Sequence, residues 1–242
     1  ITIFSSPFDN TAVDLLENLN APAYKIASFE AVDLPLIKYI AQTGKPMIIS
    51  TGMADAQEIQ EAIEAAKKGG CKELAILHCV SSYPALATDY NLRTLVDMRE
   101  KAGLVTGLSD HTIDNTTAIT SVALGASIIE KHVTLDRNGG GPDDSFSLES
   151  KELRQLCLGV KTAWESLGTV DYGRKSSEQA NVKFRRSLYF VKDIEKGEII
   201  TKDHVKSIRP GFGLPPKYLE SIIGKVSKKS IKKGFPVLKS HI

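Results

Sequence analysis

The 242-residue sequence has few cysteines and no hydrophobic stretch long enough to cross a membrane. No apolar run approaches the roughly 18–20 residues that a membrane span requires, and no basic segment followed by an apolar one marks a secretion signal. The three cysteines, Cys71, Cys79 and Cys157, cannot all pair within one chain, and none lies in a CxxC motif. We therefore expect reduced thiols, a cytoplasmic protein and no membrane partner.

Two glycine-rich phosphate-binding motifs are also absent. No strand-like run is followed by GxGxxG, and GxxxxGK[ST] does not occur. This absence disfavours an open sheet that binds a nucleotide. What the sequence does contain is typical of a globular protein, with 42% hydrophobic and 25% charged residues, and this composition excludes a disordered or collagen-like chain.

The net charge of +2 conceals an uneven distribution. Residues 185–242 contain 14 Lys and Arg against 5 Asp and Glu, a net charge of +9, whereas residues 1–184 contain 17 against 24, a net charge of −7. The difference predicts two domains with different roles. The lysines of the basic end alternate with apolar residues and lack aromatic residues spaced for stacking on bases. We therefore expect no nucleic-acid partner, and an anionic ligand or a solvated surface remain open.

Residues 1–168 alternate short β-branched runs with amphipathic helical patterns, which predicts an α/β fold with a parallel sheet. The predicted strands begin 21 to 30 residues apart. Six such units fit an open doubly wound sheet or a barrel that lacks two of its eight units. The predicted strands are Thr2–Ser5, Ala23–Ala27, Pro46–Ser50, Leu74–His78, Val105–Leu108 and Ser127–Lys131. The predicted helices are Thr11–Leu19, Leu34–Gln42, Ala56–Lys68, Asn91–Lys101, Asn115–Leu124 and Lys151–Leu167.

Beyond this region the sequence changes character. Residues 169–184 are polar and weakly periodic, and we expect a linker there. Residues 185–242 predict a small β-rich domain, with strand-like runs at Ser187–Val191 and Ile199–Ile200. The turn between these two runs has a near copy at residues 230–238, which indicates an internal repeat.

Polar or ionisable residues follow all six predicted strands. Ligands bind at the carboxyl ends of strands both in barrels and in open α/β sheets, so we expect a functional site at this face. These residues are Ser5, Ser6, Lys25, Ser28, Glu30, Ser50, Thr51, His78, Cys79, Ser109, Asp110, His111, Glu130, Lys131 and His132.

His111 and His132 stand at the ends of consecutive predicted strands. Neighbouring parallel strands lie about 4.8 Å apart, so both imidazoles can reach one divalent cation, with oxygen ligands and water completing its shell. The alternative is two polar histidines with structural hydrogen bonds. Asp110 points to the opposite side of its strand, and a role in orienting a histidine or as a base stays open.

Lys25 lies inside an apolar predicted strand, where an unpaired ammonium group is unfavourable. Its anionic partner could be the carboxylate of Glu30 or a phosphate group of the substrate, and a Schiff-base role is a third possibility. The hydroxyl groups of Ser6, Ser28 and Ser109 on nearby strand ends favour the phosphate.

Two further segments are weaker candidates. The glycine-rich loop Arg137–Ser147 is either a flexible connector or a lid that brings Asp143 or Asp144 to the ligand. Cys79 is adjacent to His78, so their side chains point to opposite faces of the strand, and a Cys-His nucleophile pair is disfavoured.

Several segments resemble the sialic acid synthase family. They are Phe4–Phe8, Ala23–Glu30, Ser50–Met53, Leu77–Cys79 with Tyr83-Pro84, Gly107–Thr112 and Ile129–His132, and Arg209–Gly213 resembles the antifreeze-like (SAF) domain of that family. Phe4–Phe8, Gly140–Leu148 and Arg209–Lys217 are most similar to the pseudaminic acid synthases within it.

The resemblance implies a (β/α)8 TIM barrel followed by a SAF domain, in a domain-swapped homodimer. It implies condensation of phosphoenolpyruvate with a 2,4-diacetamido-2,4,6-trideoxy hexose, giving pseudaminic acid and phosphate. The implied cofactor is a divalent metal, Mn²⁺, Mg²⁺ or Co²⁺. Synthesis of N-acetylneuraminate or legionaminate, a Schiff-base barrel aldolase and a carbohydrate-binding module without catalysis are the alternatives.

The resemblance also implies roles for individual residues. The catalytic side chains would be Lys25, Glu30, His111 and His132, of which the two histidines would bind the metal. The phosphoenolpyruvate contacts would be Lys25, Ser6, Ser28, Ser81 and Ser109. The sugar-side residues would be Glu30, Tyr83, Asp143 and, from the SAF domain of the partner subunit, Arg209.

The sequence starts at Ile1 without an initiator methionine. Members of the resembling family carry two further βα units before the first strand predicted here, and those units supply a glutamate, a lysine and a glutamine that contact substrate. We therefore expect a piece of a longer polypeptide, with a barrel lacking its first two βα units. We expect the 242-residue chain alone to lack synthase activity.

Overall fold

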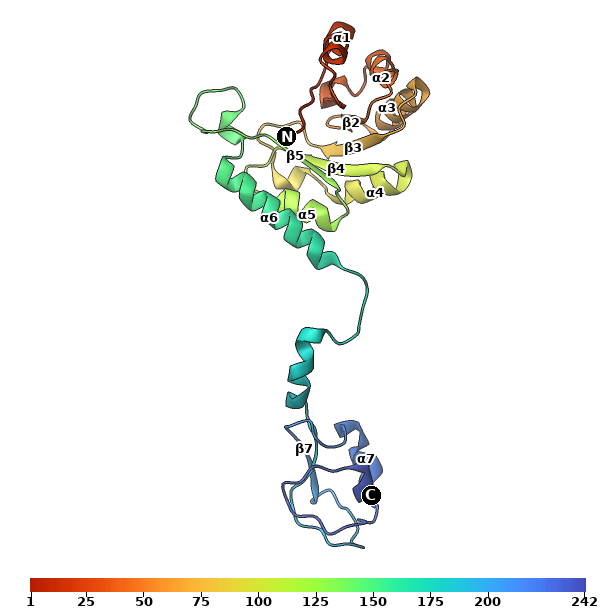
Figure 1. The fold of residues 1–242 in the computed structure, drawn as a ribbon, viewed down its shortest axis with the longest axis vertical. Helices are drawn as coiled ribbons and strands as arrows, with labels where there is room; N and C mark the ends of the chain where they lie inside the picture. The colour runs from red at the N-terminus through yellow and green to blue at the C-terminus, as the bar shows by residue number, and fades with distance from the viewer. The chain divides into compact units, whose positions relative to one another are not determined.

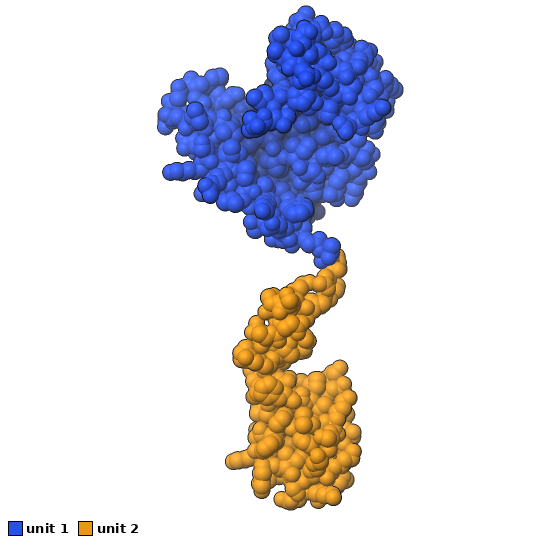
Figure 2. Space-filling model, in the orientation of Figure 1, with its two compact units in different colours: residues 1–169 blue, residues 170–242 orange.

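Residues 1–169 fold around a sheet of five parallel strands whose order in space follows their order in the sequence (Figure 1). The computed structural model describes residues 1–242, and residues 170–242 form a second unit (Figure 2). Each strand of the first unit pairs with the next one along the chain, the arrangement found in the wall of a barrel. The strands are β1 Tyr24–Ile26, β2 Met47–Ser50, β3 Leu74–Cys79, β4 Val105–Asp110 and β5 Ile128–Lys131.

The six predicted helices are all present, each within two residues of its predicted bounds. The helix Ala56–Gly69 illustrates why the bounds were predictable, because Asp55 and Glu58 form a capping box at its start. Gly70 ends it in a left-handed conformation, with φ at 106°. The helices are α1 Asn10–Asn18, α2 Leu34–Ala41, α3 Ala56–Gly69, α4 Arg93–Ala102, α5 Thr116–Ala123 and α6 Ser150–Leu167. Short 3-10 helices are η1 Ser28–Glu30, η2 Ala87–Asp89 and η3 Asp144–Phe146.

The strand predicted at Thr2–Ser5 is wrong. Only Ser5 forms a parallel bridge, to Tyr24, and its carbonyl accepts the Lys25 N–H at 3.1 Å. Ile1 and Ile3 are exposed, so the β-branched run packs against no core that would extend the pairing into a ladder. Ser5 nevertheless brings the residue after it to the edge of the sheet.

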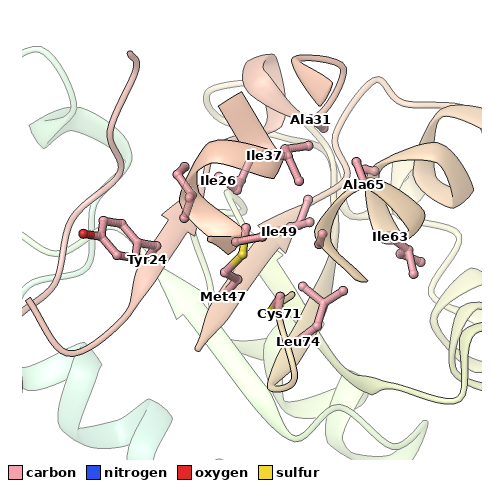
Figure 3. Close-up of a cluster of buried hydrophobic side chains, with 14 of the residues drawn as sticks. Tyr24, Ile26, Ala31, Ile37, Met47, Ile49, Ile63, Ala65, Cys71 and Leu74 are labelled. Atoms are coloured by element: carbon pink, nitrogen blue, oxygen red, sulfur yellow. The ribbon is translucent and has the colours of Figure 1, made fainter. Parts of the chain in front are cut away.

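The core of this unit lies between the sheet and the helices that cover its outer face. Tyr24 and Ile26 of β1 and Met47 and Ile49 of β2 are fully buried on this face, packed with side chains of α2 and α3 (Figure 3). Side chains alternate across a strand, so Lys25 points to the other face of the sheet. The packing of the outer face therefore decides which residues line the inner one.

The second unit contains a small antiparallel sheet and the repeated turns seen in the sequence. Its elements are η4 Ser176–Phe184, β6 Ser187–Phe190, β7 Val205–Ile208, η5 Pro216–Tyr218, α7 Leu219–Ile222 and η6 Lys239–His241. The two copies of the repeated turn pack against each other, because Ile194 and Ile231 exchange backbone hydrogen bonds of 3.0 and 2.8 Å. Residues 176–184 form a 3-10 helix, where the polar pattern indicated only a linker. No helix of the 242 residues combines the length and apolarity that crossing a membrane requires.

Candidate active site

A cavity of about 340 Å³ lies at the carboxyl ends of the parallel strands. Such a volume is within the range of small-molecule sites in proteins. Every strand from β1 to β5 contributes residues from its end or from the segment just beyond it, so the cavity lies where the sequence predicted a site. Its lining residues are Ser6, Lys25, Ala27, Ser28, Ser50, Tyr83, Ser109, His111, Glu130, Lys131 and His132.

Lys25 projects into this cavity from β1. Its side chain is only 10% exposed, and its Nζ lies 3.5 Å from Glu130 Oε2 and donates a hydrogen bond to the Ile26 carbonyl at 3.1 Å. Burial lowers the pKa of Lys25, and the negative charge of Glu130 opposes that shift. Glu30, the protein carboxylate suggested from the sequence, makes no ion pair with Lys25.

Glu130 is the residue that sequence reasoning missed. Its Oε2 faces Lys25, and its Oε1 accepts a hydrogen bond from Ser109 Oγ at 2.8 Å. The sequence marks it only as one of the polar residues at a strand end. A usable signal was present, since Glu130 and His132 are two residues apart and therefore share one face of the strand.

The imidazoles of His111 and His132 face each other, with ring centroids 5.2 Å apart. Nδ1 of His111 lies 2.8 Å from the Val80 carbonyl, which can only accept, so Nδ1 carries a proton and the neutral imidazole has its lone pair on Nε2. Nδ1 of His132 lies 3.4 Å from Asp143 Oδ2. An imidazole with one nitrogen held by an oxygen acceptor and the other free is the usual form of a metal-binding histidine.

The side chains at this site would supply only part of the coordination shell of a cation. The chain brings together no group of three or more His, Cys, Asp or Glu side chains that would hold a metal ion. Two imidazoles with free Nε2 atoms would therefore supply the protein ligands, and oxygen atoms of substrate and water would have to complete the shell. Burial lowers the pKa of His132, which favours its neutral, metal-binding form. Burial also acts to lower the pKa of His111, but its contacts with Cys79 and the Val80 carbonyl raise it overall.

The glycine-rich loop Arg137–Ser147 returns to the cavity. Phe146 is buried and packs against His132 and Tyr83, with ring centroids 5.1 and 5.5 Å apart. The Tyr83 ring in turn lies 4.3 Å from that of His111. Asp143 reaches His132, whereas Asp144 turns back to Thr134 and to the Gly141 N–H within the loop. Of the two predicted aspartates, only Asp143 contacts a cavity residue.

A second cluster lies beside the serines at the ends of β1 and β3. Ser28 Oγ accepts the Gly52 N–H at 3.1 Å and donates to Cys79 Sγ at 3.4 Å, and Ser81 Oγ lies 3.9 Å from the same sulfur. A Cβ on Gly52 would lie 2.2 Å from Ser81 Oγ and 2.8 Å from Ser28 Oγ, so any other residue there would displace both hydroxyls.

Cys79 contacts a histidine other than the one next to it in the sequence. Its neighbour His78 points away, with Nε2 2.5 Å from the Tyr90 carbonyl, as the alternation of side chains predicted. Cys79 Sγ instead lies 4.0 Å from His111 Nδ1, a contact between residues 32 positions apart. Burial raises the pKa of the Cys79 thiol, but the hydrogen bonds of His111 and Ser28 outweigh it and the net pKa is lowered.

Four predicted site residues do not line the cavity. Ser81 contacts Cys79, and Asp143 contacts His132. Glu30 ends η1, and its Oε2 is buried without a hydrogen-bond partner. Arg209 is an exposed residue of the second unit, directly after β7. The cavity is thus lined by the expected phosphate-side residues other than Ser81, by both histidines and by Tyr83, whereas Ser81 and the other expected sugar-side residues lie outside its wall.

Comparison with known proteins settles the family. Residues 1–172 match the NeuB family, and residues 185–242 match the SAF domain. The chain belongs to the NeuB family. The resemblance to sialic acid synthases and to their antifreeze-like domain is therefore confirmed, as is the α/β fold with a parallel sheet.

Individual NeuB relatives cover most of the chain. It is 41% identical over 237 residues to the pseudaminic acid synthase of Helicobacter pylori, covering 97% of this chain and 69% of that protein. It is 40% identical over 235 residues to the N,N'-diacetyllegionaminic acid synthase of Campylobacter jejuni, covering 96% and 70%. The crystal structure of the sialic acid synthetase of Leptospira borgpetersenii matches with a TM-score of 0.70 and 35% identity over 75% of this chain and 64% of that one.

Proposed function

We propose that this chain provides the catalytic cavity of an enzyme that condenses phosphoenolpyruvate with an open-chain acetamido sugar, releasing phosphate and a nine-carbon α-keto acid. The observation that carries the proposal is the gathering of a buried lysine, serine hydroxyls and two imidazoles in one 340 Å³ cavity. The named activities of the relatives, which synthesise pseudaminic, legionaminic and sialic acids, support the same reaction class.

Lys25 and the serines Ser6, Ser28 and Ser109 would bind the phosphate and carboxylate of phosphoenolpyruvate. A buried ammonium group binds a dianion more strongly than an exposed one, because the charge-assisted hydrogen bonds form away from water. Glu130 would hold Lys25 and Ser109 in orientation before the substrate arrives, since it contacts both. The lysine then exchanges part of its contact with Glu130 for the substrate phosphate.

We propose that His111 and His132 bind a divalent cation, Mn²⁺, Mg²⁺ or Co²⁺. When bound, such a cation would polarise the aldehyde oxygen of the sugar as C3 of phosphoenolpyruvate attacks the aldehyde carbon. Val80 fixes the tautomer of His111, and Asp143 lies where it can do the same for His132. Carbon–carbon bond formation and addition of water at C2 are followed by departure of phosphate from C2.

The sugar would lie toward Tyr83, Asp143 and Glu30, with Arg209 of the partner subunit over the cavity in a domain-swapped homodimer. We propose a 2,4-diacetamido-2,4,6-trideoxy hexose as substrate and pseudaminic acid as product. Legionaminic acid synthesis is a second candidate, because the relative with that name is 40% identical and the pseudaminic acid synthase 41%. A diacetamido sugar as substrate is compatible with both the pseudaminic and the legionaminic acid product. A cytoplasmic location would suit this chemistry.

We further propose that the sheet belongs to a (β/α)8 barrel. The edge of β5 pairs with no further strand. Beside it, Ile129, Leu156 and Trp164 line an apolar groove of about 610 Å³ between β5, α5 and α6. An unpaired strand edge next to an apolar groove is what a neighbouring βα unit would cover.

Phosphate release tests the reaction. The protein that contains this chain is incubated with phosphoenolpyruvate and a panel of 2-acetamido and 2,4-diacetamido sugars, with and without chelator. We expect release that requires both a sugar and a divalent metal, fastest with a diacetamido sugar. Covalent trapping of a substrate on Lys25 by borohydride would support the Schiff-base aldolase instead. Sugar binding without any phosphate release would indicate a carbohydrate-binding module.

A further inference from the structure

A buried ion pair lies directly behind the two histidines. Asp110 of β4 and Lys131 of β5 are register partners, and their side chains are 0% and 4% exposed. Asp110 precedes His111 and Lys131 precedes His132, so along each strand a member of the ion pair alternates with an imidazole. The pair therefore joins the two strands at the point where each one presents an imidazole.

The hydrogen bonds of this pair extend around the backbone of His111. Lys131 Nζ donates to Asp110 Oδ2 at 2.8 Å, to the Asp114 carbonyl at 3.0 Å and to the Thr112 carbonyl. Asp110 Oδ1 accepts the Thr112 N–H at 2.9 Å, and its Oδ2 accepts Thr112 Oγ1 at 3.1 Å. Residues on both sides of His111 are thus tied to one charge on the neighbouring strand.

Tyr90 also holds the backbone around His111 in place. Its side chain is fully buried, and its hydroxyl accepts the His111 N–H at 2.7 Å and donates to the Ser109 carbonyl at 3.3 Å. Tyr90 reaches no lining position in the cavity. Its hydroxyl hydrogen-bonds the backbone that carries two cavity side chains, Ser109 and His111.

We propose that Tyr90, Asp110 and Lys131 are positioning residues that set the separation and orientation of His111 and His132. A buried ion pair adds little net stability, because removing two charges from water is about as unfavourable as their attraction is favourable. Its value here is geometric, since a cation held by only two protein ligands tolerates little displacement of either imidazole. The inference rests on the proposed role of the histidines as metal ligands.

The experiment distinguishes a loss of protein stability from a change in the positions of the two histidines. We compare the wild-type protein with Tyr90→Phe and with the double variant Asp110→Asn/Lys131→Met, which removes both charges and leaves no buried charge unpaired. The control is Glu17→Gln/Lys45→Met, which removes a partly buried ion pair of 2.7 Å far from the histidines. Mn²⁺ affinity is measured from the electron paramagnetic resonance signal of the free ion, and folding from thermal unfolding followed by circular dichroism.

We expect Mn²⁺ affinity to fall roughly 10–100-fold in the double variant and in Tyr90→Phe, while the control keeps wild-type affinity. Tyr90→Phe deletes one oxygen atom and keeps the inference testable if the double variant fails to fold. Folded variants that bind Mn²⁺ as tightly as the wild type would overturn the inference and leave the metal site standing. A wild-type protein that binds no Mn²⁺ would instead overturn the proposed metal site, and the inference with it.

Discussion

Lys25 and Glu130 come from the two edge strands of the sheet, β1 and β5, yet their Nζ and Oε2 atoms lie 3.5 Å apart. In a flat sheet these strands would be separated by four spacings of about 4.8 Å, or about 19 Å, which two side chains reaching toward each other could not close to ion-pair distance. The sheet must therefore curl strongly (Figure 1). The curl encloses the cavity and brings a cation from one edge to an anion and two imidazoles at the other.

The first prediction concerns the role of Lys25. Replacing Lys25 with Met keeps most of the side-chain volume but removes the charge that we assign to the substrate phosphate. We expect kcat/KM for phosphoenolpyruvate to fall about 10²–10³-fold, the usual effect of losing one charge-stabilising group in an active site. Steady-state phosphate release measures this. Lys45→Met is the matched control because Lys45 is paired with Glu17 away from the cavity. Equal losses in the two variants would argue against a substrate role for Lys25.

The second prediction is a pH dependence of stability. Burial lowers the pKa of Lys25 below its ordinary value of 10.5, so the unfolded chain binds this proton more tightly than the native protein. The contribution of Lys25 to stability is therefore largest above pH 10.5 and is lost as pH falls through the lowered native pKa. The wild type should gain stability relative to Lys25→Met as pH rises toward 10.5. Urea unfolding of both proteins across alkaline pH measures the difference in their free energies of unfolding. A stability of the wild type relative to Lys25→Met that is constant or falls as pH rises would refute the prediction.

The third prediction concerns the close approach at Gly52. An Ala there would place its Cβ 2.8 Å from Ser28 Oγ and closer still to Ser81, so both hydroxyls would have to rotate. We expect a loss of about 1–3 kcal/mol in the free energy of unfolding and roughly tenfold to a hundredfold weaker phosphoenolpyruvate binding. Gly103→Ala is the control. Gly103 has φ at +62° and no neighbour within 4 Å, so its replacement should lower stability by about 1–2 kcal/mol without affecting binding. Isothermal titration calorimetry measures phosphoenolpyruvate binding by both variants. Unchanged binding in Gly52→Ala would remove Ser28 and Ser81 from the substrate site.

The fourth prediction tests the domain-swapped dimer. Arg209→Ala should raise KM for the sugar and leave the second unit folded. Because the proposed site combines one subunit's cavity with the partner's arginine, mixing inactive His111→Ala with Arg209→Ala subunits should create one intact site per mixed dimer. Activity should rise toward half of the wild-type value per mixed dimer. Subunits are exchanged by mixing the two variants in denaturant and refolding them together. Activity no higher than that of the separate variants would contradict an arginine supplied by the partner subunit.

Some of the fold and site could be predicted from local sequence, and some could not. The helices followed from periodicity and capping residues such as Asp55 and Gly70, which act within one turn of chain. The placement of Lys25, His111 and His132 at one site followed from their positions in or directly after predicted parallel strands. These signals are local, so a single sequence contains them in full.

The contacts that escaped prediction depend on tertiary geometry. The pairing of Lys25 with Glu130 requires the curl of the sheet, which is a property of all five strands together. The contact of Cys79 with His111 joins residues 32 positions apart. The β-branched residues around Ile3 have a high strand propensity, but the segment forms only one bridge, from Ser5 to Tyr24. Propensity alone does not create a strand without a partner to pair with.

The central claim is that a metal and phosphoenolpyruvate bind side by side in this cavity. Paramagnetic relaxation of the phosphoenolpyruvate ³¹P signal by Mn²⁺ measures that proximity directly. We predict strong broadening in the wild-type protein that disappears in His111→Ala, where the metal is lost, and in Lys25→Met, where the substrate is lost. Tight binding of both ligands with no Mn²⁺-dependent broadening would place them in separate sites and contradict the account.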